Sequence, residues 1–332
     1  MKRQFAATLG TGDVVDTDFV VRSADVRAAR TGETYLALEF SDRSGRVGGI
    51  MFRPPREAEA ISAGTVVRVR GKMTSYRGAL RVSVSAMRPT ESSDSHDLLP
   101  VGTRDEKELL AALRSLVRSI ADPGLARLVR EVFGDVRLMR RFKICAATDS
   151  AHHAYIGGLL EHTVAVATLC RGTADVYPEI DADLLVAAAL LHDLGVVDEI
   201  ACGASLELTD EGRLLGHVAL GARRLHAAVE RLGEGLSPGL AARLEHAVMA
   251  HHGDGAGSGA APCTLEALAL AHADATDAAV AGFAAAIAGV GATDRTWTDA
   301  ANAFGRPMRA PSVREEASDR GAARPGGLLR SA

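Results

Sequence analysis

Aromatic residues make up only 4% of this 332-residue chain, although its hydrophobic content is 47%. The chain therefore has ample material for packed cores, and these cores must consist mainly of aliphatic side chains. Long apolar runs are missing as well, because the most apolar stretch, Leu184–Leu191, is far shorter than the roughly 20 residues that span a bilayer. The N-terminal residues also lack the apolar segment of a signal peptide. We therefore expect no membrane segment and a cytoplasmic location.

Cysteine is scarce, and the four cysteines form no C-x-x-C pair: Cys145, Cys170, Cys202 and Cys263. This usage is typical of reduced thiols in a cytoplasmic protein and argues against a structural zinc site. The net charge of −4 does not by itself indicate a nucleic-acid partner. The charge is unevenly distributed, however, because basic residues outnumber acidic ones in residues 1–90 and the reverse holds afterwards. A basic first part and an acidic, histidine-rich remainder suit the binding of a polyanion and of metal, respectively.

Residues 1–90 are predicted to form a small all-β barrel of the OB type. Five segments rich in apolar residues, several of them alternating, are separated by turn residues: 19–26, 34–40, 47–52, 66–71 and 80–84. One helical turn is expected at about 57–61. Five short strands with a single helical turn fit an OB-fold.

The rest of the chain is predicted to be helical up to a polar tail. Residues 91–104 form a linker, and residues 105–290 carry apolar residues at spacings of three and four, which predicts an all-α bundle. Thr209 is a candidate N-cap, and Gly195 and Gly253 are candidate helix ends. Residues 291–332, rich in Arg, Pro, Gly and Ser, are predicted to be a disordered tail.

Histidines and aspartates recur in order at or near the ends of the apolar helical stretches. The set consists of His162, His192, Asp193, His217, His251, His252 and Asp274. Imidazole and carboxylate groups hold catalytic metals, and a helix bundle can direct them into one pocket. A single histidine near a helix end is more often a hydrogen-bonded structural residue. The recurrence in five segments predicts a metal site.

The predicted site holds two divalent metal ions. His192 and Asp193, at a helix end, are the predicted catalytic residues, and Asp193 can bridge the two ions. His162, His192 and Asp274 complete the first set, and His217, His251 and His252 surround the second. Such a pair of ions can activate a water molecule and stabilise phosphoryl oxygens. The absence of thiolates favours manganese, iron or magnesium over a structural zinc. The remaining histidines of the helical part, His226, His246 and His272, are expected to face away from the site.

The order H…HD…H…HH…D resembles that of the HD-domain metal phosphohydrolases. Segments 151–163, 208–217 and 250–253 are more specifically similar to the YhaM-type bacterial 3′–5′ exoribonucleases, and the resemblance covers about residues 5–280. It implies an OB-fold joined to an HD domain and a metal-dependent, preferably manganese-dependent, removal of nucleotides from the 3′ end of RNA. It leaves single-stranded DNA open as a further substrate. The chain departs from the family at Val196, where the pattern His-Asp-x-Gly-Lys has a lysine.

Single-stranded RNA is the predicted partner, because OB-folds bind single strands through basic grooves and aromatic stacking. The predicted RNA-binding residues are Tyr35, Arg68, Arg70, Lys72, Tyr76, Arg77 and Arg81 of the barrel, with His152 and His153 at the mouth of the metal pocket. Two alternatives stay open: an HD-type nucleotide or cyclic-dinucleotide phosphohydrolase, and a non-catalytic nucleic-acid-binding factor with a weakened site. A homo-oligomer is also left open.

Overall fold

The computed structural model describes residues 2–28, 33–76, 79–90, 95–99, 102, 104–149, 151–203, 206–254 and 260–291, and residues 296–310 except 299, 301 and 303. The prediction for Arg77 falls outside these ranges, and the side chain of Tyr76 is not described either. In this described part, no helix is long and apolar enough to cross a membrane.

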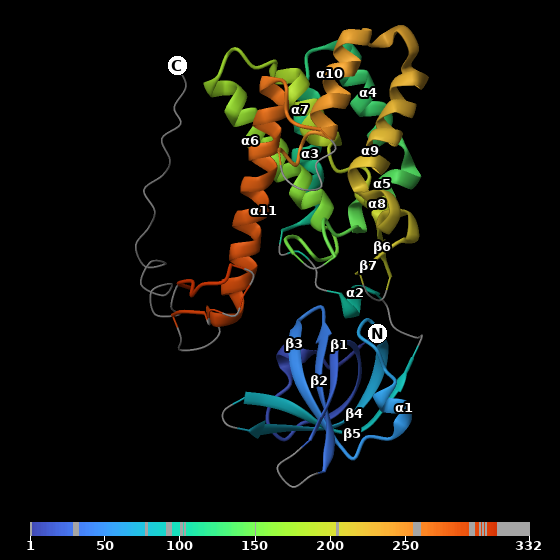
Figure 1. Ribbon diagram of the computed structural model, residues 1–332, viewed down its shortest axis with the longest axis vertical. Coiled ribbons are helices and arrows are strands. Elements are labelled where there is room, and N and C mark those ends of the chain that lie inside the picture. Colours follow the sequence, from blue (N-terminus) through green and yellow to red (C-terminus); the bar gives the residue numbers. More distant parts are fainter. Residues whose placement is uncertain are drawn as a thin grey trace. The chain divides into compact units, whose positions relative to one another are not determined.

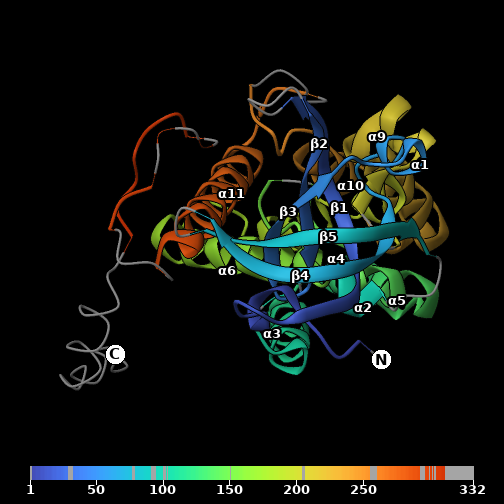
Figure 2. The same ribbon diagram turned by 90° about the horizontal axis from the view of Figure 1, so that it is seen from below.

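The first part of the chain is a closed five-stranded barrel with the strand order β1-β2-β3-β5-β4 (Figure 1). Its strands are β1 (Val14–Ala28), β2 (Thr34–Asp42), β3 (Gly45–Phe52), β4 (Val66–Tyr76) and β5 (Ala79–Pro89). Neighbouring strands are antiparallel except β3 and β5, which run parallel. Figure 2 shows β4 and β5 as the neighbouring long strands of this barrel. The predicted OB barrel is confirmed, and helix α1 (Arg56–Glu59) supplies the expected helical turn.

Alternation of side chains explains the barrel. Phe19 of β1 and Phe40 of β2 point inward, where their rings stack with centroids 5.6 Å apart. Along β4, buried Val67 and Val69 alternate with more exposed arginines, as expected for a strand with one face in a core. The barrel is therefore filled by aliphatic residues and one aromatic pair.

The predicted linker contains one ordered turn, helix α2 (Ser95–Leu98). Its Asp97 carboxylate accepts a hydrogen bond from the backbone N–H of Lys2 at 3.1 Å and pairs with Arg43 at 3.2 Å. This part of the linker is thus held by residues of the barrel region.

Nine further helices follow. They are α3 (Glu106–Ser119), α4 (Pro123–Gly134), α5 (Val136–Ile144), α6 (Gly158–Val176), α7 (Ala182–Leu191), α8 (Val196–Glu199), α9 (Asp210–Leu232), α10 (Pro238–Met249) and α11 (Leu265–Gly291), all within the described ranges. Many begin at a side chain that accepts a hydrogen bond from the first turn, including Thr209, as predicted. One stretch departs from the all-helical expectation: β6 (Ile200–Cys202) and β7 (Leu206–Leu208) pair between α8 and α9. This pairing buries Ile200 and Leu206 where the chain passes from α8 to α9.

Helix α7 is the centre of the helical core. Every residue from Leu184 to Leu191 is buried, so this helix has no polar face and must be surrounded by other helices. The chain emerges from it at His192. The sequence suggested that Gly195 ends this helix, but α7 already ends at Leu191, and Gly195 lies just before the short helix α8.

The segment after α11 includes local structure. The backbone of Thr298 and that of Met308 hydrogen-bond at 2.9 Å, Trp297 and Arg309 form an isolated bridge, and the rings of Phe283 and Phe304 lie 5.4 Å apart. The predicted disorder from residue 291 onward therefore does not apply to all of residues 296–310. Residues 311–332 lie outside the described ranges.

Candidate metal centre

The structure brings all seven predicted ligands together from five places in the chain. His162 lies in the first turns of α6, His192 and Asp193 follow α7, and His217 lies in α9. The remaining three are His251 and His252, which follow α10, and Asp274 in α11. Most of this set is buried, and His162, His192 and His251 are fully inaccessible.

One group of side chains surrounds His162. Its Nε2 atom lies 3.2 Å from Nε2 of His192 and 3.1 Å from Oδ1 of Asp274. Asp193 directs Oδ2 at the same point, 3.5 Å from Nε2 of His162 and 3.5 Å from Nε2 of His192. Ligand atoms of His162, His192 and Asp193 all lie within 4.8 Å of one another, which is close enough to share one metal ion.

A second group adjoins the first and is more open. Nε2 of His217 lies 2.8 Å from Nε2 of His252, and these two side chains with His251 again place one ligand atom each within 4.8 Å. The other oxygen of Asp193, Oδ1, faces this group at 3.4 Å from His251 and 3.7 Å from His217. Asp193 therefore presents one carboxylate oxygen to each group.

The hydrogen bonds of the ring nitrogens fit a cation. Nδ1–H of His192 donates to the carbonyl of Ala189 at 2.8 Å, and Nδ1–H of His251 donates to that of Val248 at 2.6 Å. A backbone carbonyl only accepts, so the neutral form of each ring has its lone pair on Nε2, directed into the cluster. Within the described part of the chain, buried Nε2 of His251 and Oδ1 of Asp193 lack a hydrogen bond of good geometry. A metal ion would accept these converging lone pairs, whereas burying polar atoms that have no partner is costly.

The protonation of the cluster agrees with metal binding. Burial lowers the pKa of His192 to about 4, which leaves this imidazole neutral and able to ligate at neutral pH. Burial favours the protonated form of Asp193, but His192 and the other histidines around it outweigh this effect and hold the carboxyl pKa well below its usual value. Asp193 is therefore a charged carboxylate.

Glu199 is a residue of this site that the sequence did not reveal. Its carboxylate accepts two hydrogen bonds from His217, one from the backbone N–H at 3.0 Å and one from Nδ1–H at 2.9 Å. The backbone N–H is available because Gly216, with φ 71°, interrupts α9 just before His217. Burial lowers the pKa of His217, but Glu199 and Asp193 more than offset this and raise it to about 8. No local spacing links Glu199 to a histidine 18 residues later, so only the fold shows the pair.

The predicted substrate-contacting histidines lie beside the first group. The rings of His152 and His153 are 5.2 Å and 5.6 Å from the ring of His162. His153 adopts the left-handed backbone conformation, with φ 48°, and its Nδ1 lies 2.7 Å from the hydroxyl of Tyr155. Tyr155 in turn donates its O–H to Glu161 at 2.9 Å. This chain of contacts fixes the orientation of His153 beside the cluster.

The predicted RNA-binding residues of the barrel do not form one uniform surface. Lys72 and Arg70 are exposed on β4, but Arg68 bonds Asp16 at 2.6 Å and Asp18 at 3.2 Å on the neighbouring strand β1. The register explains this loss of free charge, because Arg68 is directly opposite Asp18 and Arg70 directly opposite Asp16. Sequence alternation alone could not show which acidic residues would oppose the arginines.

An aromatic pair lies elsewhere on the barrel. Tyr35 of β2 is paired in register with Phe52 of β3, and their rings lie 6.0 Å apart. Phe52 is 54% exposed, so it is a surface residue. Arg81, the last predicted RNA-binding residue, lies partly buried on β5 opposite Gly48 of β3.

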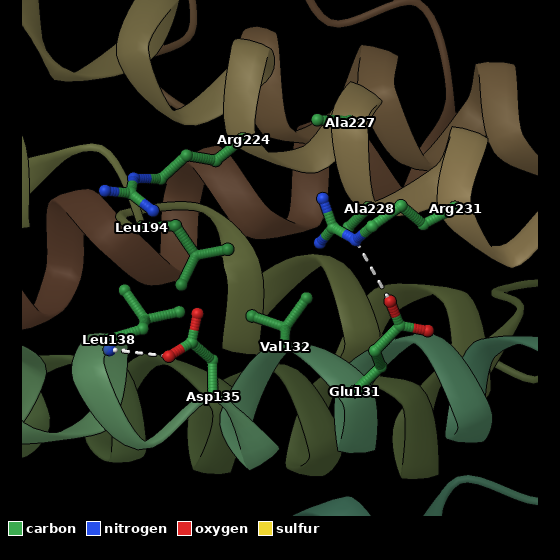
Figure 3. A pocket seen from close by; sticks show the side chains of 9 residues that line it. All are labelled: Glu131, Val132, Asp135, Leu138, Leu194, Arg224, Ala227, Ala228 and Arg231. Atoms are coloured by element: carbon green, nitrogen blue, oxygen red, sulfur yellow. Dashed lines mark hydrogen bonds and ion pairs between the residues drawn. The ribbon is translucent and has the colours of Figure 1, made fainter.

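A cavity of about 400 Å³ lies between α4, α5 and α9 and touches the loop that carries Asp193 (Figure 3). Leu194, the residue after Asp193, forms part of its wall. Its polar groups are largely engaged, since Arg231 pairs with Glu131 at 3.2 Å and Asp135 accepts from the backbone N–H of Leu138. Among the described residues that line this cavity there is no histidine, so it is separate from the metal centre.

Comparison with known proteins agrees with this two-part organisation. The HD domain family matches residues 159–279, and the OB-fold nucleic acid binding domain family matches residues 20–90. Proteins named 3′–5′ exoribonuclease YhaM from Bacillus velezensis and Bacillus subtilis are each 29% identical over 225 residues, which is 67% of this chain and 71% of theirs. The protein of that name from Bacillus pumilus is 29% identical over 230 residues, 68% of this chain and 73% of its own.

The HD family match spans all seven clustered ligands, and the OB-fold match covers most of the barrel. The 225 residues aligned with the relatives are more than either family match spans by itself. With its barrel followed by a helical domain that gathers the H…HD…H…HH…D residues, the chain is similar to the proteins of the YhaM type.

Proposed function

We propose that this protein is a metal-dependent 3′–5′ exoribonuclease that hydrolyses the phosphodiester bonds of single-stranded RNA. The observation that carries the proposal is the position of Asp193, which offers one oxygen to each of two adjoining histidine groups. The relatives named 3′–5′ exoribonuclease supply the polarity of the reaction and the class of substrate.

Two divalent ions, manganese by preference, are proposed to occupy the centre. His162, His192 and Asp274 hold the first, His217, His251 and His252 hold the second, and Asp193 contributes to both. Bound there, such ions lower the pKa of a water molecule and stabilise negative charge on the phosphoryl oxygens. Nitrogen and oxygen donors without a thiolate suit manganese, iron or magnesium.

The protein's own groups position the ligands and the substrate. Carbonyl acceptors fix the rings of His192 and His251, and the Glu199 carboxylate fixes that of His217. His152, partly exposed beside His162, is proposed to donate a hydrogen bond to a phosphate oxygen of the terminal nucleotide. The burial of the first group excludes bulk water, which strengthens these electrostatic interactions.

The barrel is proposed to hold the strand from which nucleotides are removed. Tyr35 and exposed Phe52 offer stacking faces for bases, and exposed Arg70 and Lys72 offer charge for phosphates. Arg68 and Arg81 are proposed as further RNA contacts, with Arg68 weakened by its acidic partners. Tyr76 stays a prediction from the sequence.

The test uses the full-length protein, manganese and one single-stranded RNA labelled at its 3′ end or its 5′ end. A 3′–5′ exonuclease releases the 3′ label first, as a mononucleotide, whereas the 5′-labelled strand shortens progressively. Asp193→Asn serves as the inactive control. Hydrolysis of mononucleotides or cyclic dinucleotides without cleavage of RNA would contradict the proposal, and so would RNA binding without any hydrolysis. A single-stranded DNA of the same sequence tests the wider substrate range.

A further inference from the structure

Two cysteine thiols from distant parts of the sequence lie close together beside the short helix α8. Sγ of Cys145, just after α5, lies 3.5 Å from Sγ of Cys202, the last residue of β6. The two residues are 57 positions apart in the chain. Cys145 is buried and Cys202 is partly exposed, so one thiol of the pair can meet a small solute from solvent.

The surroundings of Cys202 favour its thiolate. Its sulfur is in hydrogen-bond contact with the Cys145 sulfur and accepts a hydrogen bond from the backbone N–H of Ala146 at 3.4 Å, and the Arg141 guanidinium is nearby. These contacts, led by the one with Cys145, outweigh burial and lower the pKa of the Cys202 thiol to about 7. The same contact and burial raise the pKa of Cys145, which therefore stays a thiol. A thiolate beside a thiol is the arrangement of a reactive cysteine with its resolving partner.

The pair also lies next to the short helix that carries Glu199. Sγ of Cys145 is 3.8 Å from the carbonyl of Val196, the first residue of α8, and 4.0 Å from that of Ile200, which directly follows α8. Cys202 follows α8 directly through β6. Cys145 thus contacts the segment that carries Glu199, the residue bonded to His217, and Cys202 directly follows that segment in the chain.

We propose that Cys145 and Cys202 are an oxidation site, which forms a reversible disulfide with peroxide and thereby lowers the activity of the metal centre. The Cys202 thiolate attacks a peroxide oxygen, the O–O bond breaks, and Cys202 becomes a sulfenic acid while water is released. The Cys145 thiol then displaces the sulfenic oxygen as a second water molecule. Two thiols and one hydrogen peroxide give one disulfide and two water molecules.

Closing the bond requires movement. The sulfurs are 3.5 Å apart, whereas bonded sulfurs lie about 2.05 Å apart, so about 1.5 Å must be gained. Cys145 is buried against α8, whereas Cys202 lies on a strand of only three residues, so β6 is the part expected to shift. A shift of β6 moves Glu199, three residues before Cys202, away from His217. Loss of such a carboxylate–histidine contact typically costs 10–100-fold in metal affinity or activity, roughly.

The test exposes the full-length, manganese-loaded protein to hydrogen peroxide and, separately, to diamide, which oxidises thiols without peroxide chemistry at a bound metal. Disulfide formation is read by intact mass and by peptide mapping without reductant, and RNA hydrolysis is measured in parallel. Cys202→Ser removes the reactive thiol, and Cys263→Ser is the matched control because Cys263 is exposed and remote in sequence.

We expect the unaltered protein and Cys263→Ser to lose two hydrogen atoms, to yield a Cys145–Cys202 peptide and to lose about tenfold in rate, with recovery in dithiothreitol. Cys202→Ser should show none of these changes. Absence of the cross-linked peptide overturns the site, and a cross-link without a change in rate overturns its effect on activity. The activity part rests on the proposed function, but the cross-link is read without RNA, so failure of the one is distinguishable from failure of the other.

Discussion

The contact between Glu199 and His217 offers the sharpest test of the metal centre. Glu199→Gln replaces two carboxylate oxygens by one carbonyl oxygen and one amide group. The carboxylate accepts from both the backbone N–H and the Nδ1–H of His217, at 3.0 Å and 2.9 Å. Glutamine can accept only one of these hydrogen bonds well, and its NH₂ group opposes the other donor. Glu199→Ala removes both.

The magnitude follows from the role of the contact. A carboxylate that accepts from the non-ligating nitrogen of a metal-binding histidine is typically worth about 10- to 100-fold in metal affinity, or about 1.4–2.8 kcal/mol. Because His217 belongs to the more open second group, the loss should fall on one ion of the pair. We expect Glu199→Gln to lower the affinity for that ion about tenfold and Glu199→Ala to lower it further. The affinity of the group around His162 for its ion should be unchanged.

The assay is a calorimetric titration of metal-free protein with manganese, beside RNA hydrolysis at increasing manganese. Glu211→Gln is the matched control, because Glu211 is an exposed residue of the first turn of α9 that pairs with Arg223 at 3.8 Å. High manganese should restore most of the rate of Glu199→Gln. Unchanged affinity and rate in both Glu199 variants would refute the reasoning that this carboxylate positions a ligand.

Three other outcomes are expected. Asp193→Asn should abolish metal binding by elemental analysis and RNA hydrolysis, yet leave the melting temperature of the metal-free protein unchanged or higher, since Oδ1 of Asp193 is buried without a good hydrogen bond; substantial residual hydrolysis would count against the assignment. In metal-free protein, the raised pKa of His217 contributes about 2 kcal/mol to the free energy of unfolding below pH 6.5, and this contribution is lost as pH rises through about 8. Urea unfolding at several pH values should show this decline. Manganese affinity should rise over the same interval, because protons and metal compete for Nε2. Tyr35→Ala and Phe52→Ala should each weaken RNA binding by about 1–3 kcal/mol in fluorescence anisotropy, with an unchanged rate on a dinucleotide; an equal loss of rate on the dinucleotide would argue against a stacking role.

The sequence predicted those parts of the fold that depend on local periodicity. Apolar segments separated by turn residues marked all five barrel strands, and an apolar run followed by His192 and Asp193 marked the most buried helix. The convergence of most candidate ligands could be expected because they lie near the start of α6 or directly after α7 and α10, and such helix ends meet in a bundle. His217 and Asp274 lie within α9 and α11 instead. These features depend on residues that are close together in the sequence.

Features that depend on contacts between distant segments could not be predicted in this way. Glu199 meets His217 only because Gly216 interrupts α9, and Arg68 meets Asp16 and Asp18 only because of the register of β1 and β4. The β6–β7 pair was missed because strands of three residues carry too short a pattern to distinguish from a helix end.

The fold explains why a valine, Val196, is accommodated at the position where the pattern His-Asp-x-Gly-Lys has a lysine. Val196 is 1% exposed and belongs to the apolar core of the helical domain, where its carbonyl lies near Cys145. A lysine here would have to bury its charge or extend past the core, and either is costly without a partner. The two arginines beside α8 are already committed, since Arg141 and Arg224 both bind Asp198. The valine thus contributes packing where the family places a cation, and it removes none of the seven clustered ligands. We therefore expect any cationic contact to phosphate in this protein to come from groups other than residue 196. Burial lowers the pKa of His152, so this side chain beside His162 offers a neutral hydrogen-bond donor and no charge.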